Sequence, residues 1–336
     1  MTPFRSISQR HRAKDGGVAL IVVLLLMATL STLAVAMTST IRLTTARTLA
    51  GESAAQARWY ALGAETFSAL LMEAQWRADP ARDLLSDQWV SETATLPLDN
   101  GIMTADLRDN TVCFNLNSLV DGGAGERSAS DERIAEYELL LEAVGFGSSA
   151  RGALTDSLVD WLDSDNFARS DGAEDSDYAS LDVPYRAANA LLADVSELRT
   201  VYWYSPEVYQ RLLPFVCAHP TTQASAINLN MVTDGNAPVL YAMLGGKLSV
   251  DETKSLIAAR PQDGYTTLEQ FWASHPQFET DPPSEEMVSR PNLWCRYVRL
   301  DATVSHVEAQ MAMTSELEIS KDGTASVLAR RFGLIE

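Results

Sequence analysis

A run of residues without any charge most constrains what this chain can fold into. Residues 18–37 are apolar except for Thr29, Ser31 and Thr32, and a basic leader ends in Gly17 directly before them. No small-residue cleavage site follows the apolar run, as it would in a secretory signal peptide. We therefore expect the leader, residues 1–17, to be cut off between Gly17 and Val18 and the apolar helix to be retained.

The length and the flank of this run predict a membrane-spanning helix. Residues 18–37, at 1.5 Å rise per residue, extend for about 30 Å, which is the thickness of a bilayer's hydrocarbon core. The leader contains four basic side chains, and such charge favours the cytoplasmic side: Arg5, Arg10, Arg12 and Lys14. The sequence predicts a single-pass membrane protein with its C-terminal body outside the cytoplasm. A plain signal anchor of an unrelated exported protein is the alternative.

Helical character continues beyond the apolar run. Residues 38–77 contain helix formers and no proline, and apolar residues recur at intervals of three and four. This spacing predicts one apolar face on a continuing helix, which Pro80 would end. We expect one long helix over 18–78, with its first part in lipid and its second part against a folded body.

Strand-like segments lie at two places that are far apart in the sequence. Residues 79–116 contain candidate strands at 89–93, 101–107 and 112–114, with a turn signal at 99–101, and residues 293–336 contain an alternating run over 294–319 and a hairpin turn at 321–323. Residues 117–292 read as helices with recognisable caps, such as Ser249 with Glu252. The pattern predicts an α+β fold in which a long N-terminal helix packs on a small antiparallel sheet and a large helical domain is inserted between strands.

The charge balance narrows the possible partners. The formal net charge is −19, and because residues 1–17 hold four Lys and Arg and one Asp, the remaining chain carries −22. Proteins that bind nucleic acid neutralise phosphates with basic side chains, so we expect no nucleic-acid partner. Three cysteines allow one disulfide in any of three pairings, and the absence of a CxxC motif does not favour a zinc site.

Acidic residues are most concentrated between residues 160 and 182. Eight Asp and Glu lie there against one basic residue, Arg169, and aromatic residues interleave them. Calcium is bound by six to eight oxygens, so a cation would relieve the repulsion among these carboxylates. The sequence predicts a calcium site formed by Asp163, Asp165, Asp171, Glu174, Asp175 and Asp177. A solvated acidic loop is the alternative.

Enzymatic chemistry has little support. Paired carboxylates would suit a periplasmic hydrolase, which we keep as a dissenting hypothesis. The chain has no GxSxG or HExxH motif and no glycine-rich phosphate loop, and its four histidines are scattered. We expect no catalytic residues. The stretch from Ala226 to Pro261 resembles helix-hairpin-helix modules, but only Lys247 follows the hairpin glycines, so we expect a scaffold without a DNA function.

Several segments together resemble one family. They are the Gly17/Val18 junction with its apolar helix, Cys113–Asn117, Leu158–Asp163, Asp171–Asp175, Pro184–Asn189, Pro214–Ala218 and Ile227–Asn230. With these segments the chain resembles the K-type minor pseudopilins of bacterial type II secretion systems over nearly its whole length. A minor pilin of a type IV pilus is the related alternative.

The resemblance implies a pilin-like fold with a helical domain of the SAM or helix-hairpin-helix type and no enzymatic activity. It implies a prepilin peptidase that cuts after Gly17 and methylates Val18, calcium in the helical domain, and a Cys113–Cys217 disulfide. The implied partners are the major pseudopilin and other minor pseudopilins, which would form a complex at the pseudopilus tip that starts assembly. Most pilin-like proteins have Glu at the fifth mature position, where this chain has Val22. A tip subunit has no neighbour above it to pair with such a carboxylate, so its loss suits the tip.

Overall fold

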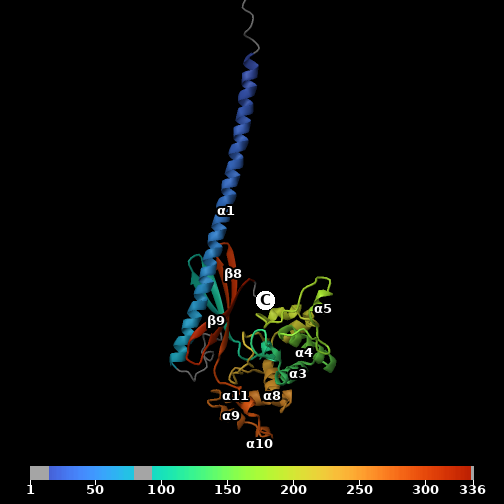
Figure 1. The fold of residues 1–336 in the computed structure, drawn as a ribbon. Helices are drawn as coiled ribbons and strands as arrows, with labels where there is room; N and C mark the ends of the chain where they lie inside the picture. The colour runs from blue at the N-terminus through green and yellow to red at the C-terminus, as the bar shows by residue number, and fades with distance from the viewer. Residues whose placement is uncertain (1–14, 79–92, 334–336) are drawn as a thin grey trace, which may run out of the picture.

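The structure is a computed structural model that describes residues 15–78 and 93–333. One helix, α1 (Asp15–Ala78, 64 residues), projects from a folded body and packs on it only with its C-terminal part (Figure 1). The long helix predicted over 18–78 is confirmed. Its N-terminal part is exposed and is long and apolar enough to cross a membrane. Alanines near its C-terminal end, including Ala57, Ala61 and Ala64, are buried against the sheet.

The sheet has five antiparallel strands in the order β1-β2-β7-β8-β9. The strands are β1 (Ala94–Leu98), β2 (Gly101–Asp109), β7 (Tyr297–His306), β8 (Ala309–Ile319) and β9 (Ala325–Phe332). The predicted turn at 99–101 joins β1 to β2, with Asn100 in the left-handed region (φ 62°). The strand predicted at 89–93 lies almost entirely outside the described residues, and the first observed strand begins at Ala94.

The prediction of one alternating run over 294–319 is wrong. A tight turn at Val307 and Glu308 divides this run into β7 and β8, which pair with each other. Val307 has a φ of 54° and its side chain is 69% exposed, so it belongs to the turn and not to the apolar face. Alternation continues on both sides of a two-residue turn, which is why the sequence pattern does not reveal the break.

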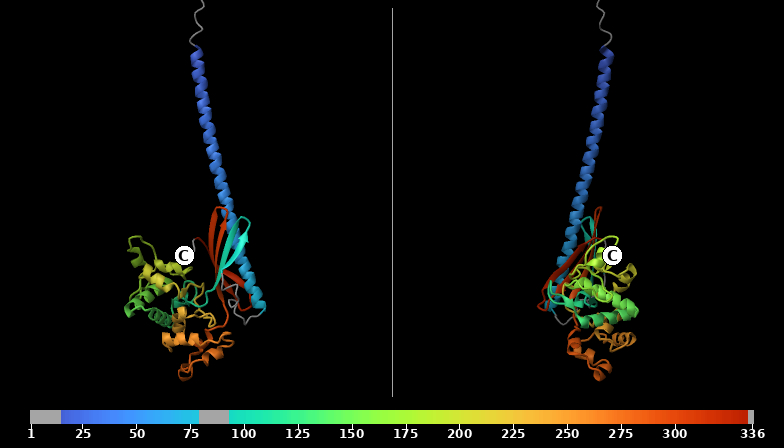
Figure 2. Two further views of the ribbon diagram at one scale, coloured as in Figure 1. Left: turned by 180° about the vertical axis from the view of Figure 1, so that it is seen from behind. Right: turned by 45° about the vertical axis from the view of Figure 1, so that its right-hand side comes forward.

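A helical domain is inserted between β2 and β7 and lies beside the sheet, away from α1 (Figures 1 and 2). Its helices are α3 (Asp131–Val144), α4 (Ser148–Leu162), α5 (Asp175–Ala179), α6 (Pro206–Leu212), α7 (Ala237–Met243), α8 (Val250–Ala258), α9 (Leu268–Trp272), α10 (Gln277–Thr280) and α11 (Glu285–Ser289). Short 3-10 turns are η1 (Leu116–Leu119), η2 (Val195–Thr200) and η3 (Asp234–Asn236), and short strands are β3 (Phe114–Asn115), β4 (Val120–Asp121), β5 (Ser128–Ala129) and β6 (Val216–Cys217).

Local capping explains where several of these helices begin and end. Ser249 caps α8 through its hydroxyl, which accepts a hydrogen bond from the Glu252 N–H. Gly145 ends α3 in the left-handed conformation, which glycine adopts without steric cost. Helix α4 begins at Ser148, and α6 ends at Leu212. The predicted α+β fold, with a helical insert between strands, is confirmed.

Candidate metal centre and buried disulfide

Three of the predicted acidic residues converge at the end of α4. Asp163 is the C-terminal cap of α4, Glu174 precedes α5, and Asp165 lies on the loop between them. Each offers a carboxylate oxygen, and these oxygens lie within 4.8 Å of one another. Asp163 and Glu174 are buried, whereas Asp165 is exposed. Such a cluster of oxygens, open on one side, suits a hard divalent cation.

Several oxygens of this cluster lack a hydrogen-bond donor. Both carboxylate oxygens of Glu174 and one oxygen of Asp163 are buried without a hydrogen-bond partner among the described residues. The amide oxygen of Asn189 is also buried without a hydrogen-bond partner among the described residues. The amide nitrogen of Asn189 donates to the main-chain oxygen of Asp165 at 2.8 Å. Buried polar atoms are nearly always paired, so these unpaired acceptors mark the carboxylate cluster as a candidate cation site. The residues present fit a calcium ion.

Burial makes this cluster unfavourable for ionised carboxylates. Burial, followed by the charge of Asp160, raises the pKa of Glu174 to about 7. Burial, followed by the charge of Asp165, raises the pKa of Asp163 to about 6. Asp160 lies beside them and accepts a hydrogen bond from the Arg169 N–H at 3.1 Å, yet burial still raises its pKa to about 7. A bound cation would compensate for this cost of burial.

The other three predicted ligands do not join the cluster. An oxygen of Asp177 accepts a hydrogen bond from the Glu174 N–H at 2.9 Å, and an oxygen of Asp175 accepts one from the Ala187 N–H at 3.0 Å. The main-chain oxygen of Asp171 accepts a hydrogen bond from the indole N–H of Trp203 at 3.1 Å. These residues therefore shape the loop, whereas Asn189 contributes a further polar side chain beside Asp165. The sequence signal that points to Asn189 is the Pro184–Asn189 segment, which carries part of the family resemblance.

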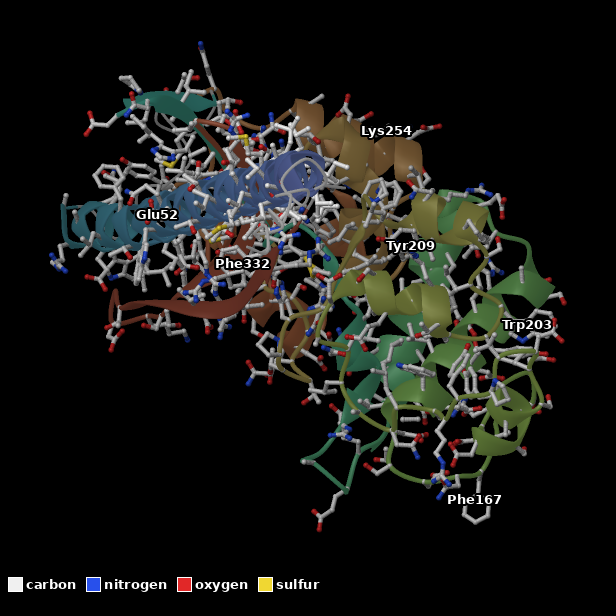
Figure 3. The ribbon with its side chains drawn as sticks, turned by 90° about the horizontal axis from the view of Figure 1, so that it is seen from above. Glu52, Phe167, Trp203, Tyr209, Lys254 and Phe332 are labelled. Atoms are coloured by element: carbon white, nitrogen blue, oxygen red, sulfur yellow. A yellow bond between two sulfur atoms is a disulfide. The ribbon has the colours of Figure 1, made fainter. Side chains whose placement is uncertain are left out.

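The acidic loop also exposes aromatic side chains. Phe167 follows Asp165 by two residues and its N–H donates to the Asp165 carboxylate at 2.8 Å. Its ring is 84% exposed and projects from the edge of the helical domain (Figure 3). Trp161 and Tyr178 pack edge to face on the inner side of the loop, with ring centres 5.1 Å apart. Aromatic packing therefore anchors the two ends of the loop to the core, while Phe167 faces solvent.

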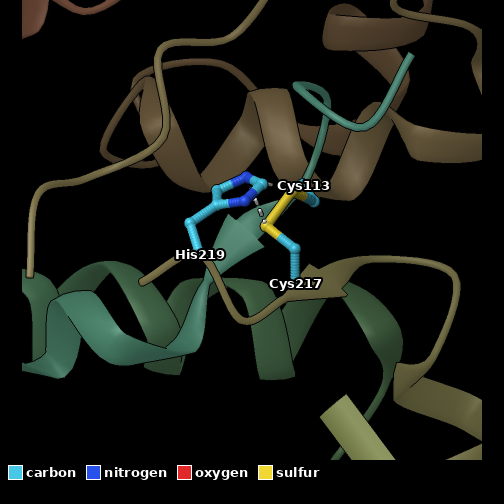
Figure 4. A group of neighbouring side chains, drawn as sticks. All are labelled: Cys113, Cys217 and His219. Carbon is cyan, nitrogen blue, oxygen red and sulfur yellow. Dashed lines mark hydrogen bonds between the residues drawn. A yellow bond between two sulfur atoms is a disulfide. The ribbon is translucent and has the colours of Figure 1, made fainter. Parts of the chain in front are cut away.

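A buried disulfide joins distant parts of the helical domain. Cys113 and Cys217 are 104 residues apart and are bonded, which is the pairing that the resemblance implies. The neighbouring strands β3 and β6 pair in parallel, and His219 lies against the disulfide (Figure 4). Its ring stacks on Tyr297 with ring centres 3.8 Å apart. Cys295 is fully buried outside the disulfide, 3.7 Å from the Thr111 hydroxyl.

Two further predictions concern the leader junction at Gly17 and Val18 and the two glycines after α7. Gly17 and Val18 lie in the first turn of α1, so cleavage between them stays a prediction. Gly245 and Gly246, after α7, are both left-handed, and their N–H groups donate to main-chain oxygens of Ala242 and Tyr241. These N–H groups are therefore already engaged within the hairpin, rather than directed outward as in a phosphate-binding loop.

A long N-terminal helix that packs on a small antiparallel sheet with its C-terminal part defines the pilin-like class of subunits. Two family models described as type II secretion system protein K match residues 112–221 and 227–287. The chain is 36% identical over 260 residues to type II secretion system protein K of Pectobacterium carotovorum, which covers 77% of this chain and 79% of the relative. It is 32% identical over 325 residues to the Klebsiella pneumoniae protein, covering 96% and 98%.

A solved structure shows the same architecture. The crystal structure of the GspK-GspI-GspJ complex from enterotoxigenic Escherichia coli contains a chain that matches with a TM-score of 0.72 and 26% identity, covering 86% of this chain and 100% of that chain. The chain belongs to the type II secretion system protein K family. It is a minor pseudopilin and a structural component, not an enzyme, which decides against both the hydrolase and the type IV pilin alternatives.

Proposed function

We propose that this minor pseudopilin occupies the tip of the pseudopilus and starts its assembly for the export of folded proteins across the outer membrane. A prepilin peptidase removes the leader, and α1 then holds the chain in the inner membrane with its body in the periplasm. The chain joins other minor pseudopilins, because the related chain forms a complex with GspI and GspJ. The major pseudopilin extends the fibre below them.

The observation that carries the tip placement is the helical domain. It is larger than the sheet and lies beside it, away from α1 (Figure 2). A subunit in the shaft must accept identical neighbours all round, and a bulky lateral domain obstructs that repetition. Val22 supports the same placement, since a carboxylate in a membrane helix is costly unless a neighbour pairs with it.

The tip placement is tested by restoring the carboxylate. Val22→Glu should reduce tip labelling by antibodies in electron micrographs and the number of pseudopili per cell. Val23→Glu is the matched control, because it introduces the same charge at nearly the same membrane depth without recreating the fifth-position carboxylate. Unchanged initiation with Val22→Glu, or equal loss with both variants, would count against the tip.

We also propose that calcium binds to Asp163, Asp165 and Glu174, with Asn189 as a further oxygen ligand. The unpaired acceptors of Glu174, Asp163 and Asn189 support this assignment. Calcium would neutralise the converging carboxylates and connect the end of α4 to the start of α5. Its role here is structural, because it would hold the acidic loop in one conformation against the helical core.

A further inference from the structure

The disulfide and His219 form a second group of potential metal ligands. Its ligand atoms are sulfur and nitrogen, whereas those of the acidic loop are oxygens. The Nε2 atom of His219 lies 3.3 Å from the Cys217 sulfur and 3.6 Å from the Cys113 sulfur. Cys113 directly precedes strand β3 and Cys217 lies in β6, and their Cα atoms are 5.7 Å apart. Two sulfurs and an imidazole nitrogen at one buried place are the ligand types that zinc prefers.

We propose that, before the disulfide forms, Cys113 and Cys217 as thiols bind one zinc ion together with His219. This inference does not depend on the tip placement or on calcium. The chain must pass through the thiol form, because the disulfide is made after synthesis. In that form the two sulfurs are free to separate and to ligate a metal.

The separations between His219 and the two sulfurs agree with a tetrahedral site. Zinc bonds of about 2.3 Å to sulfur and about 2.0–2.1 Å to nitrogen place these ligands about 3.5 Å apart. The two observed separations between Nε2 and sulfur, 3.3 and 3.6 Å, bracket that value. The hydroxyl of Ser225 lies 3.8 Å and 4.0 Å from the same sulfurs and would face the fourth position. His219 therefore already lies at ligand distance from both sulfurs, whereas the sulfurs, which are bonded to each other in the disulfide, would have to separate to about 3.8 Å for a tetrahedral zinc.

The state of His219 suits this role. His219 is 1% exposed, and its ring shares one buried site with the two sulfurs. Stacking on Tyr297 fixes the ring plane, while the main-chain N–H of His219 donates to the Asn115 side chain at 3.0 Å. The ring is thus held at the sulfurs by contacts that do not involve the disulfide.

The two states exclude each other chemically. Zinc binding to the two thiols releases two protons and leaves a dithiolate complex. A disulfide-containing oxidant then accepts the two electrons, which forms the sulfur–sulfur bond, reduces the oxidant to its dithiol with uptake of two protons, and releases zinc. In the zinc state the metal would hold β3 next to β6 and protect both thiols from pairing with Cys295.

Cobalt provides a direct test on the full-length protein in detergent micelles. The disulfide is reduced with a phosphine, the reductant is removed without oxygen, and calcium is kept in excess to fill the carboxylate site. We expect one Co²⁺ per chain with the intense thiolate-to-cobalt charge-transfer band and tetrahedral d–d bands, both abolished by Zn²⁺. The oxidised protein should show neither, and Cys295→Ser should behave like the wild type.

The histidine variant decides whether the native geometry is used. His219→Ala should weaken binding at least about ten-fold. Zinc should also raise the urea midpoint of the reduced wild-type protein, because a ligand that prefers the folded state stabilises it. If the reduced His219→Ala variant does not fold, the effect of zinc on the urea midpoint of the reduced wild-type protein decides whether the site exists. No thiolate band, equal affinity in His219→Ala, or a midpoint that zinc lowers or leaves unchanged would overturn the proposal.

Discussion

Glu65 of α1 and Arg330 of β9 form an ion pair that fastens the long helix to the sheet. The Arg330 Nε atom donates to the Glu65 carboxylate at 2.7 Å, and the Ser315 hydroxyl donates to the same oxygen at 2.6 Å. The Glu65 side chain is 5% exposed and the Arg330 side chain 37% exposed. Apolar packing of alanines alone would let α1 slide along the sheet, whereas this polar contact specifies one position.

Removing the buried carboxylate should therefore destabilise the body. Glu65→Ala leaves Arg330 and Ser315 without their acceptor, and we expect a loss of about 1–3 kcal/mol in the free energy of unfolding. Urea unfolding followed by tryptophan fluorescence measures this. Glu52→Ala, at an exposed position on the same helix, is the control and should leave the midpoint nearly unchanged. Equal effects of the two variants would show that the pair does not fasten the helix.

The same pair predicts a dependence of stability on pH. Burial raises the pKa of Glu65, but hydrogen bonds from Arg330 and Ser315 outweigh it and hold the pKa below its ordinary value of 4.5. Because the folded state holds the proton less tightly than the unfolded state, this stabilisation is complete above pH 4.5 and is lost as the pH falls below it. Glu65→Gln should flatten this part of the profile of unfolding free energy against pH. A profile as steep as that of the wild type would contradict the prediction.

Gly323, in the turn between β8 and β9, should not tolerate a side chain. Its φ is +82°, and a Cβ atom there would lie 2.1 Å from the Cδ1 atom of Trp76 on α1. Trp76 packs edge to face on Trp294, which restricts its movement. Gly125→Ala is a matched control, since its φ is +81° and no atom lies within 4 Å of the added Cβ.

We expect Gly125→Ala to cost about 1 kcal/mol of unfolding free energy through backbone strain alone, and Gly323→Ala to cost at least about 1–3 kcal/mol more. Thermal unfolding of both variants by circular dichroism compares them directly. Equal melting temperatures would mean that Trp76 moves away freely.

The disulfide should contribute strongly to the stability of the helical domain. Cys113 and Cys217 enclose a long loop with a separation of 104 residues, and loss of such a crosslink costs about 2–5 kcal/mol. The double variant Cys113→Ser, Cys217→Ser should unfold at lower urea concentration and should not respond to reductant. Cys295→Ser, by contrast, should remain sensitive to reductant like the wild type. A wild-type midpoint that reductant leaves unchanged would contradict this expectation.

Calcium removal should loosen the acidic loop. We expect a chelator to lower the melting temperature of the wild type, and Glu174→Gln or Asp163→Asn to weaken calcium binding at least about ten-fold in calorimetric titrations. Asp182→Asn removes an exposed charge outside the cluster and should bind calcium nearly as the wild type does. If Asp182→Asn weakened binding as much as Glu174→Gln, general acidity rather than a built site would explain the affinity.

Local features of this protein follow from its sequence. The extent of α1, the cap at Ser249, the stop at Gly145 and the turn at Asn100 all depend on residues within a few positions of one another. Short-range preferences of this kind act on the backbone directly, so the pattern predicts them. The order of helix, strands, helical insert and strands follows from the same signals.

Tertiary structure decided which of the acidic residues converge. Asp163, Asp165 and Glu174 meet because α4 ends and α5 begins at one place, while Asp175 and Asp177 are used as hydrogen-bond acceptors within the loop. All lie in one short stretch of sequence, and the sequence predicted them as one group. The direction of each side chain depends on how the aromatic core holds the loop, which spacing alone does not specify.

The group of Cys113, Cys217 and His219 is the clearest case of a site that only the fold creates. Cys113 and Cys217 are separated by more than a hundred residues and have no metal-binding spacing, yet they meet because β3 and β6 pair. Sequence determined the elements of this protein, since local backbone preferences act over a few residues. Packing decided its sites, since their atoms are brought together by burial of apolar surface shared across the whole chain.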